Sequence, residues 1–411
     1  MLSCARTWRV LAAARFAALV LPLAFGTAAF GAPESHFAFA VVANVMTSPA
    51  DEPAARRLID AIGLDRRNAF LVYDGNLKGL DEPCADALYD RRLALLDASR
   101  APVVFVPGQH DWTTCGLNGA GGYDPVERLD LLRQTFFANP TTLGQNPLAV
   151  TRESELSRFR PYRENVRWQF GDTVFVAMNV PNGNNHYLNA GGRNGEFEDR
   201  VIANRFWLER AAEYARRTNA RAIVIFIEAD PMPARSEHAK RFDWLPFSYH
   251  PRDGYEEFRH DLIRVARSFR GPIVIVHTVN AKLPRGFVID QPLRGARGKP
   301  VANVTRIAFS LRAPLTQWLE VDDDMKRRPP LRVSVRNVPR NLPPLPPLSP
   351  NLTVPTPGAA VPDVASIPDY TEIPGMPQAP AFLPGDEGAP ASAIAPPPDE
   401  QQPGGQNPPG W

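Results

Sequence analysis

Continuous apolar runs alternate with segments of helical spacing along the first two thirds of the chain. The run 37–45 is apolar except at Asn44, as in a buried strand, whereas 53–62 places Leu58, Ile59 and Ile62 on one helical face. The alternation predicts strands at 37–45, 69–73, 102–106, 173–180, 222–227 and 272–277. It predicts helices at 53–62, 81–98, 124–137, 199–216 and 256–269.

From residue 286 the pattern changes to strands alone, expected at 287–290, 304–310, 317–321 and 331–335. Repeated strand–helix units predict a mainly parallel sheet, and the closing run of strands predicts a second sheet packed on the first. The expected fold class is therefore α/β, a two-sheet sandwich flanked by helices.

The first 31 residues have the pattern of a secretory signal peptide. Arg6, Arg9 and Arg15 precede an apolar segment at 16–25, and small residues follow up to a predicted cleavage after Gly31. An uncleaved amphipathic anchor is the alternative. The apolar segment is short for a membrane span, and no other run approaches that length. We expect a periplasmic or secreted protein with no stable membrane span after signal removal.

Residues 337–411 differ in composition from the rest, with Pro-Pro pairs separated by Gly, Ala and Gln. Such a segment buries too little apolar surface to offset its ordering entropy, so it is predicted to be disordered or polyproline II. It would act as a spacer, and binding of a proline-recognising partner is the alternative. Residues 32–336 remain for one large folded domain, near the size limit of a single core.

Composition and charge exclude several functions. The chain is 44% hydrophobic and 22% charged, which is typical of a soluble globular protein. A formal net charge of +2 gives no overall attraction to nucleic acid, so no nucleic-acid partner is expected. The sequence has no P-loop, dinucleotide-binding glycine fingerprint, serine nucleophile elbow or zinc-finger spacing.

Two cysteines remain once the signal peptide, which contains Cys4, is removed. Cys84 and Cys115 are predicted to form a disulfide because the protein would reach an oxidising compartment; two separate thiols are the alternative. The bond would fix the loop that carries His110 and Asp111.

Polar residues follow several predicted strands, at the sheet edge where open α/β folds collect their chemistry. The motif Gly108-Gln109-His110-Asp111 follows the strand 102–106. His110 is either functional or a loop histidine that bonds a backbone carbonyl, and Asp111 either binds a ligand or caps the turn.

Other strand ends carry Asn44, Asn76, Glu228 and Asp230. The asparagines are expected to satisfy loop amides. A carboxylate that ends a buried strand is costly without a partner, which could be an arginine or a metal. The Gly/Asn-rich loop beginning at 182–187 would either shape a substrate pocket or be flexible and solvated.

Five motifs, in this order along the chain, resemble those of the calcineurin-like metallophosphoesterases, in particular an exported bacterial branch. They are residues 39–44, 74–79 followed by Cys84, 107–115, 122–128 and 165–168. The resemblance covers roughly residues 37–325. It implies a four-layer α/β/β/α sandwich, hydrolysis of phosphate esters such as a phosphorylated small molecule, and a dinuclear site at strand ends.

Such a site holds two divalent ions, Mn, Fe, Zn or Mg, which clamp the phosphate and activate a hydroxide. Anionic oxygens must lie between the ions. Where the family has Asp-x-His, this chain has Asn44-Val45-Met46; Asn76 aligns with the bridging Asp, and Gln109 replaces an asparagine ligand.

The later family motifs differ as well. His277 stands beside the position of a Gly-His-x-His motif, but Ala281 falls on a ligand position. We therefore expect an exported metallophosphoesterase-like protein with a degenerate metal site and weak or lost hydrolysis. The alternative is an active enzyme in which Asp111, Glu228, Asp230 and His277 surround one ion and His110 is the general acid.

Overall fold

The computed structural model describes residues 36–187, 194–232, 252–289, 292–294 and 298–345. The predicted signal peptide 1–31 and residues 346–411 of the predicted tail lie outside this part. The chain divides into two units, 1–352 and 353–411, and every described residue belongs to the first. Within the described residues, no helix combines the length and the apolar character that a membrane crossing requires.

The described residues form two mixed sheets. The smaller has five strands in the order β12-β11-β1-β2-β3, with β1–β3 parallel and β11 and β12 antiparallel. Their bounds are β1 His36–Val42, β2 Asn68–Asp74, β3 Val103–Val106, β11 Gln317–Asp324 and β12 Leu331–Asn337.

The larger sheet has seven strands among the described residues, in the order β4-β5-β6-β7-β8-β10-β9. Its four central strands, β6, β7, β8 and β10, are parallel. Their bounds are β4 Thr151–Arg152, β5 Val166–Phe170, β6 Thr173–Ala177, β7 Ala222–Phe226, β8 Ile273–Thr278, β9 Phe287–Val288 and β10 Val304–Phe309. β4 and β5 were not predicted: β4 has only 2 residues, and β5 alternates apolar and polar residues instead of forming a continuous apolar run.

The prediction that the closing strands make a separate second sheet is wrong. β11 and β12 extend the sheet that β1 begins, whereas β9 and β10 extend the sheet of β6–β8. Hydrophobic periodicity identifies a strand but does not identify its neighbours, which pairing and packing decide.

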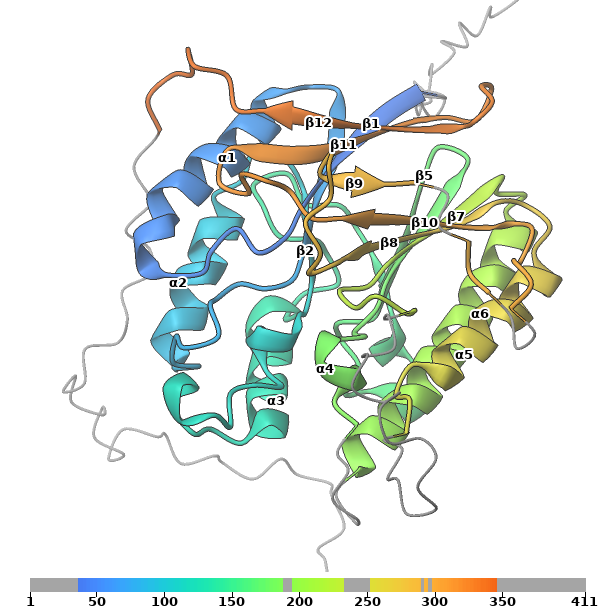
Figure 1. The fold of residues 1–411 in the computed structure, drawn as a ribbon, viewed down its shortest axis with the longest axis horizontal. Coiled ribbons are helices and arrows are strands. Elements are labelled where there is room, and N and C mark those ends of the chain that lie inside the picture. The colour runs from blue at the N-terminus through green and yellow to red at the C-terminus, as the bar shows by residue number, and fades with distance from the viewer. Residues whose placement is uncertain (1–35, 188–193, 233–251, 290–291, 295–297, 346–411) are drawn as a thin grey trace, which may run out of the picture. The chain divides into compact units, whose positions relative to one another are not determined.

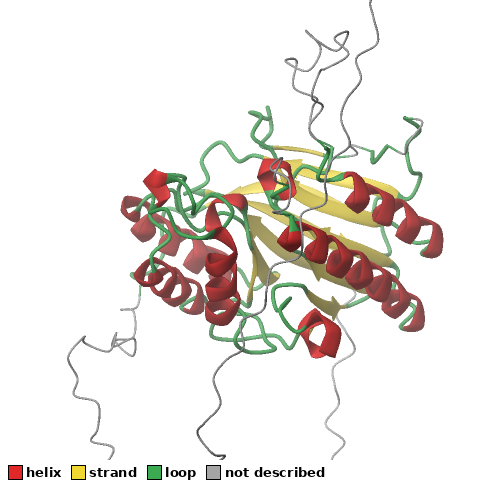
Figure 2. Ribbon diagram, turned by 90° about the horizontal axis from the view of Figure 1, so that it is seen from below, coloured by secondary structure: helices red, strands yellow, loops and turns green. Residues whose placement is uncertain are grey.

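Helices cover the outer face of each sheet, so the layers run helix, sheet, sheet, helix (Figures 1 and 2). α1 (Glu52–Leu64), α2 (Asp86–Asp97) and α3 (Pro125–Phe136) pack on the smaller sheet, and α5 (Gly195–Arg217) and α6 (Glu256–Ser268) on the larger. Successive side chains of β1 point to opposite faces of the sheet. Phe39 and Val41 pack against the other sheet, whereas Ala40 and Val42 pack against the helices.

The predicted disulfide between Cys84 and Cys115 is confirmed. Both residues are buried in the layer between the smaller sheet and its helices. Cys84 precedes α2 and Cys115 follows the turn after β3, so the bond joins two loops at one end of that sheet.

Removal of this bond should reduce stability. The cross-link closes a loop with a sequence separation of 31 residues, which corresponds to about 3 to 4 kcal/mol of unfolding free energy in the chain-entropy model. Urea denaturation of the oxidised protein, the reduced protein and the Cys84→Ala/Cys115→Ala variant checks this. Equal midpoints for all three would contradict it.

Candidate functional site

The loops that follow β1, β2, β3 and β7 meet at one end of the sandwich. Asn44 has a φ of +53°, in the left-handed region that asparagine tolerates better than most residues. Gly75 has a φ of +54°, and a Cβ there would lie 2.9 Å from both the Glu228 Cγ and the Gly108 Cα. These loops are therefore packed too closely for a side chain at position 75.

Asn76 lies at the centre of this meeting point. Its Oδ1 accepts the backbone N–H of His110 at 2.6 Å. Its Nδ2 donates to Asn44 Oδ1 at 2.8 Å and to Glu228 Oε1 at 2.9 Å. A backbone N–H can only donate and a carboxylate can only accept, so these partners fix the orientation of the amide. Asn76 consequently presents hydrogens, not oxygen, to Glu228.

Glu228 is 1% exposed and is bound by three N–H groups. Besides Asn76, the backbone N–H groups of Gln109 and Asn182 donate to its Oε2 at 2.7 and 2.8 Å. Burial raises the pKa of Glu228, and these donors oppose that shift. Glu228 therefore links the loops of the larger sheet to those of the smaller sheet through uncharged N–H donors.

Asp111 directs its carboxylate to the turn that carries it. Its Oδ1 accepts the N–H of Leu77 at 2.5 Å, and its Oδ2 accepts the N–H of Gly108 at 2.7 Å. Burial raises the pKa of Asp111 to about 7 despite these bonds. In this arrangement Asp111 holds the β2 and β3 loops together.

His110 is half-buried at the edge of an open pocket of about 490 Å³ that Asn44 also lines. The other walls include Pro49, Leu80 and Asp81. Burial, followed by the nearby Lys78 ammonium, lowers the pKa of His110. The pocket opens beside this imidazole at the meeting point of the loops.

Asp230 and His277 lie apart from this cluster. Asp230 pairs with Arg306 of β10, with 2.5 Å between carboxylate oxygen and guanidinium nitrogen. His277 is fully buried, its Nδ1 lies 2.9 Å from the carbonyl oxygen of Thr278, and burial lowers its pKa to about 4. The structure thus brings Asn44, Asn76, Gln109, His110, Asp111 and Glu228 together and leaves Asp230 and His277 in a second group.

Within the described ranges, no set of three or more His, Cys, Asp or Glu side chains is placed to hold a metal ion. In the first group, the carboxylates Glu228 and Asp111 bind N–H donors of the chain itself.

A left-handed turn completes the cluster, and sequence reasoning missed it. α4 (Asn182–Asn185) is followed by His186, and the φ angles from Gly183 to His186 are +72°, +59°, +56° and +56°. Left-handed backbone costs roughly 1–2 kcal/mol per non-glycine residue, with asparagine the most tolerant. The Asn/Gly composition of this stretch is the signal that predicts such a turn.

Contacts from several elements hold the turn in place. Arg200 of α5 donates to Asn185 Oδ1 at 2.5 Å and to its carbonyl oxygen at 2.9 Å, and Asn185 Nδ2 donates to the Gly254 carbonyl at 2.9 Å. His186 pairs with Glu196 at 3.1 Å. The expectation of a flexible, solvated loop at 182–187 is therefore wrong at Asn185. This residue is buried and hydrogen-bonded to both Arg200 and Gly254.

A buried polar network lies behind this turn. Asn165 donates from Nδ2 to Glu153 Oε2 at 2.8 Å and to Asn204 Oδ1 at 2.9 Å, and its Oδ1 accepts the backbone N–H of Asn179 at 3.1 Å. Asn165 belongs to one of the motifs that carry the family resemblance, and here it links β5, α5 and the loop after β6. Its role in this network is structural.

No protein-family model matches the chain, and no curated protein matches it. Among solved structures, similarity is found to "GAP50 the anchor in the inner membrane complex of Plasmodium". The identity is 8% and the TM-score 0.39, over 74% of this chain and 85% of that one. A likeness of this degree carries no argument about the function of this chain.

Addition of a methyl group at Gly108 should disrupt the cluster. A Cβ there would lie 2.4 Å from Asn76 Oδ1 and 2.9 Å from the Gly75 Cα. We expect Gly108→Ala to lower the free energy of unfolding by about 2–3 kcal/mol through overpacking.

Gly195 is the matched control, because a Cβ there has no atom within 4 Å. Gly195→Ala should leave the melting temperature unchanged or slightly raised. Thermal unfolding of both variants, followed by circular dichroism, distinguishes them; equal losses would show that the close packing at Gly108 is unimportant.

Glu153 should make stability depend on pH. Burial raises its pKa from 4.5 to about 8, so between these values the folded protein keeps a proton that the unfolded chain releases. Stability should therefore fall as the pH rises from about 4.5 to about 8. Glu153→Gln removes this titration and should flatten the decline in melting temperature over that range. An unchanged slope would contradict the assignment.

Proposed function

We propose that this protein is an exported metallophosphoesterase-like domain that binds a ligand or partner without hydrolysing phosphate esters. The helix, sheet, sheet, helix order of layers supports the α/β/β/α sandwich that the sequence resemblance implies. The convergence of Asn44, Asn76 and the Gln109–His110 turn supports the alignment of those positions with the family's metal site. The buried Cys84–Cys115 disulfide fits an oxidising compartment, periplasmic or secreted.

The orientation of Asn76 is the observation on which the proposal rests. Two adjacent divalent ions require anionic oxygens between them. Asn76, aligned with the bridging ligand, instead turns its Nδ2 hydrogens toward Glu228 and Asn44. An amide donor thus occupies the position from which an anionic oxygen would bind the ions, and the residues present do not fit a dinuclear centre.

The single-ion alternative has less support. It needs Asp111, Glu228, Asp230 and His277 around one ion, but Asp111 binds two loop amides and Asp230 binds Arg306. The pocket beside His110 and Asn44 remains open to a ligand, for which a phosphorylated small molecule is the class that the resemblance suggests.

Metal analysis and hydrolysis together test this function. The untagged full chain is incubated with Mn²⁺, desalted and analysed for bound metal, and hydrolysis of an aryl phosphate is measured beside His110→Ala. We expect no stoichiometric metal and no hydrolysis above that of His110→Ala. One or more ions per chain, with hydrolysis lost in His110→Ala, would overturn the proposal.

Aspartates at positions 44 and 76 should destabilise the protein in the absence of metal. In Asn44→Asp/Asn76→Asp, the carboxylate introduced at position 76 cannot donate to Glu228 and sets two acidic groups together, which should cost about 3 kcal/mol of unfolding free energy without metal. Asn118, an exposed asparagine, provides the control Asn118→Asp, which should be neutral. Mn²⁺ should raise the melting temperature of the double variant and leave the wild type unchanged; a rise in the wild type would contradict the prediction.

A further inference from the structure

The chain that leaves β12 runs back across α1 and is held there. The Val338 N–H donates to the Thr316 carbonyl oxygen at 2.9 Å. Farther along, Arg57 of α1 donates from Nη1 to the carbonyl oxygen of Pro343 at 2.7 Å and from Nη2 to that of Leu342 at 3.0 Å. One guanidinium thus binds two successive carbonyl groups of an extended segment.

Two leucines of this segment, three residues apart, are less exposed than the residues around them. Leu342 and Leu345 are half-buried, whereas Asn341, Pro343 and Pro344 are exposed. Three residues per turn is the repeat of the polyproline II helix. The sequence favours that conformation, because proline fixes its own φ and restricts the residue before it to extended backbone.

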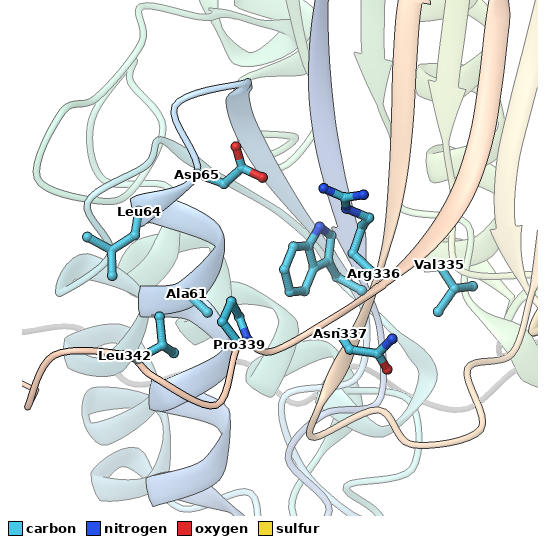
Figure 3. A pocket seen from close by; sticks show the side chains of 9 residues that line it. Ala61, Leu64, Asp65, Val335, Arg336, Asn337, Pro339 and Leu342 are labelled. Atoms are coloured by element: carbon cyan, nitrogen blue, oxygen red, sulfur yellow. The ribbon is translucent and has the colours of Figure 1, made fainter.

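The first leucine lies at an apolar pocket. Leu342 and Pro339 form one side of a pocket of about 490 Å³, and Ala61 of α1, Trp318 of β11 and Val335 of β12 are among the residues that line it. Figure 3 shows Leu342 and Pro339 beside Ala61 on the same side of α1. The surface made by Arg57, Ala61, Leu64, Trp318 and Val335 is called the α1 surface below.

The sequence continues the same repeat beyond the described residues. Leu-Pro-Pro-Leu-Pro-Pro-Leu spans 342–348, so Leu348 follows Leu345 by the same three residues. At about 3.1 Å per residue, polyproline II places these leucines along one edge at intervals of roughly 9 Å. The sequence after residue 345 therefore continues the pattern of the docked part.

We propose that the α1 surface is a docking site for a leucine-bearing polyproline II segment, and that its occupant is this chain's own segment 342–348. Leu342, Leu345 and Leu348 form the contact edge, and Arg57 binds the backbone carbonyls. Attachment in the same chain gives an effective concentration in the millimolar range, so a weak contact suffices for docking.

Methyl NMR of the leucine-labelled full chain tests the docking. We expect the methyl signals of Leu342, Leu345 and Leu348 to lie away from random-coil positions in the wild type and to move toward them in Arg57→Ala. The matched control is Arg66→Ala, which removes an exposed arginine near the end of α1 and should leave all three in place. Two results would overturn the proposal. The methyl signals of Leu348 could have random-coil chemical shifts in the wild type, or the signals of all three leucines could be the same in Arg57→Ala as in the wild type.

A second measurement tests the surface itself. A fluorescent peptide of residues 341–352 is titrated into the full chain and into Leu342→Ser/Leu345→Ser/Leu348→Ser, whose folding is verified by circular dichroism. We expect at least roughly tenfold tighter binding to the triple variant, because its own segment no longer competes. Addition of Arg57→Ala should remove that binding. Equal affinity for both proteins would show that the segment does not occupy the α1 surface.

Discussion

The hydrogen bond from Asn76 to Glu228 joins the two halves of this protein at its candidate site. Asn76 follows a strand of the smaller sheet and Glu228 a strand of the larger one. Both side chains are buried, so each would carry an unsatisfied polar group without the other. The loops around them, including the turn at Gly108 and the left-handed turn after β6, are packed to keep these groups in contact.

Three buried carboxylates lie at this end of the sandwich, and two of them accept hydrogen bonds from uncharged N–H groups. Glu228 and Asp111 are bound by N–H groups, and the carboxylate of Asp74 has no hydrogen-bond partner among the described residues. Burial raises the pKa of all three. Glu228 and Asp111 belong to one hydrogen-bonded network at the ends of the two sheets.

The sequence places Asn44, Asn76 and His110 after neighbouring parallel strands, but it does not specify how these side chains are used. Asn44, Asn76 and His110 come together because parallel strands end at the same edge of a sheet. Asp230, in the loop after β7, and His277, on the neighbouring strand β8, form a separate group with Arg306. Residue type alone does not distinguish these outcomes, since a carboxylate at a strand end accepts equally from an arginine, an amide or a metal.

The sequence by itself determined the strands and helices of the buried core, because a continuous apolar run or a 3.6-residue period has few other stable uses. It also favoured the cysteine pair, because Cys84 and Cys115 are the two cysteines outside the predicted signal peptide. Only the tertiary structure decided which sheet the closing strands join and that Asn76 presents its nitrogen to Glu228. These features depend on partners far apart in the chain, and no local pattern specifies such contacts.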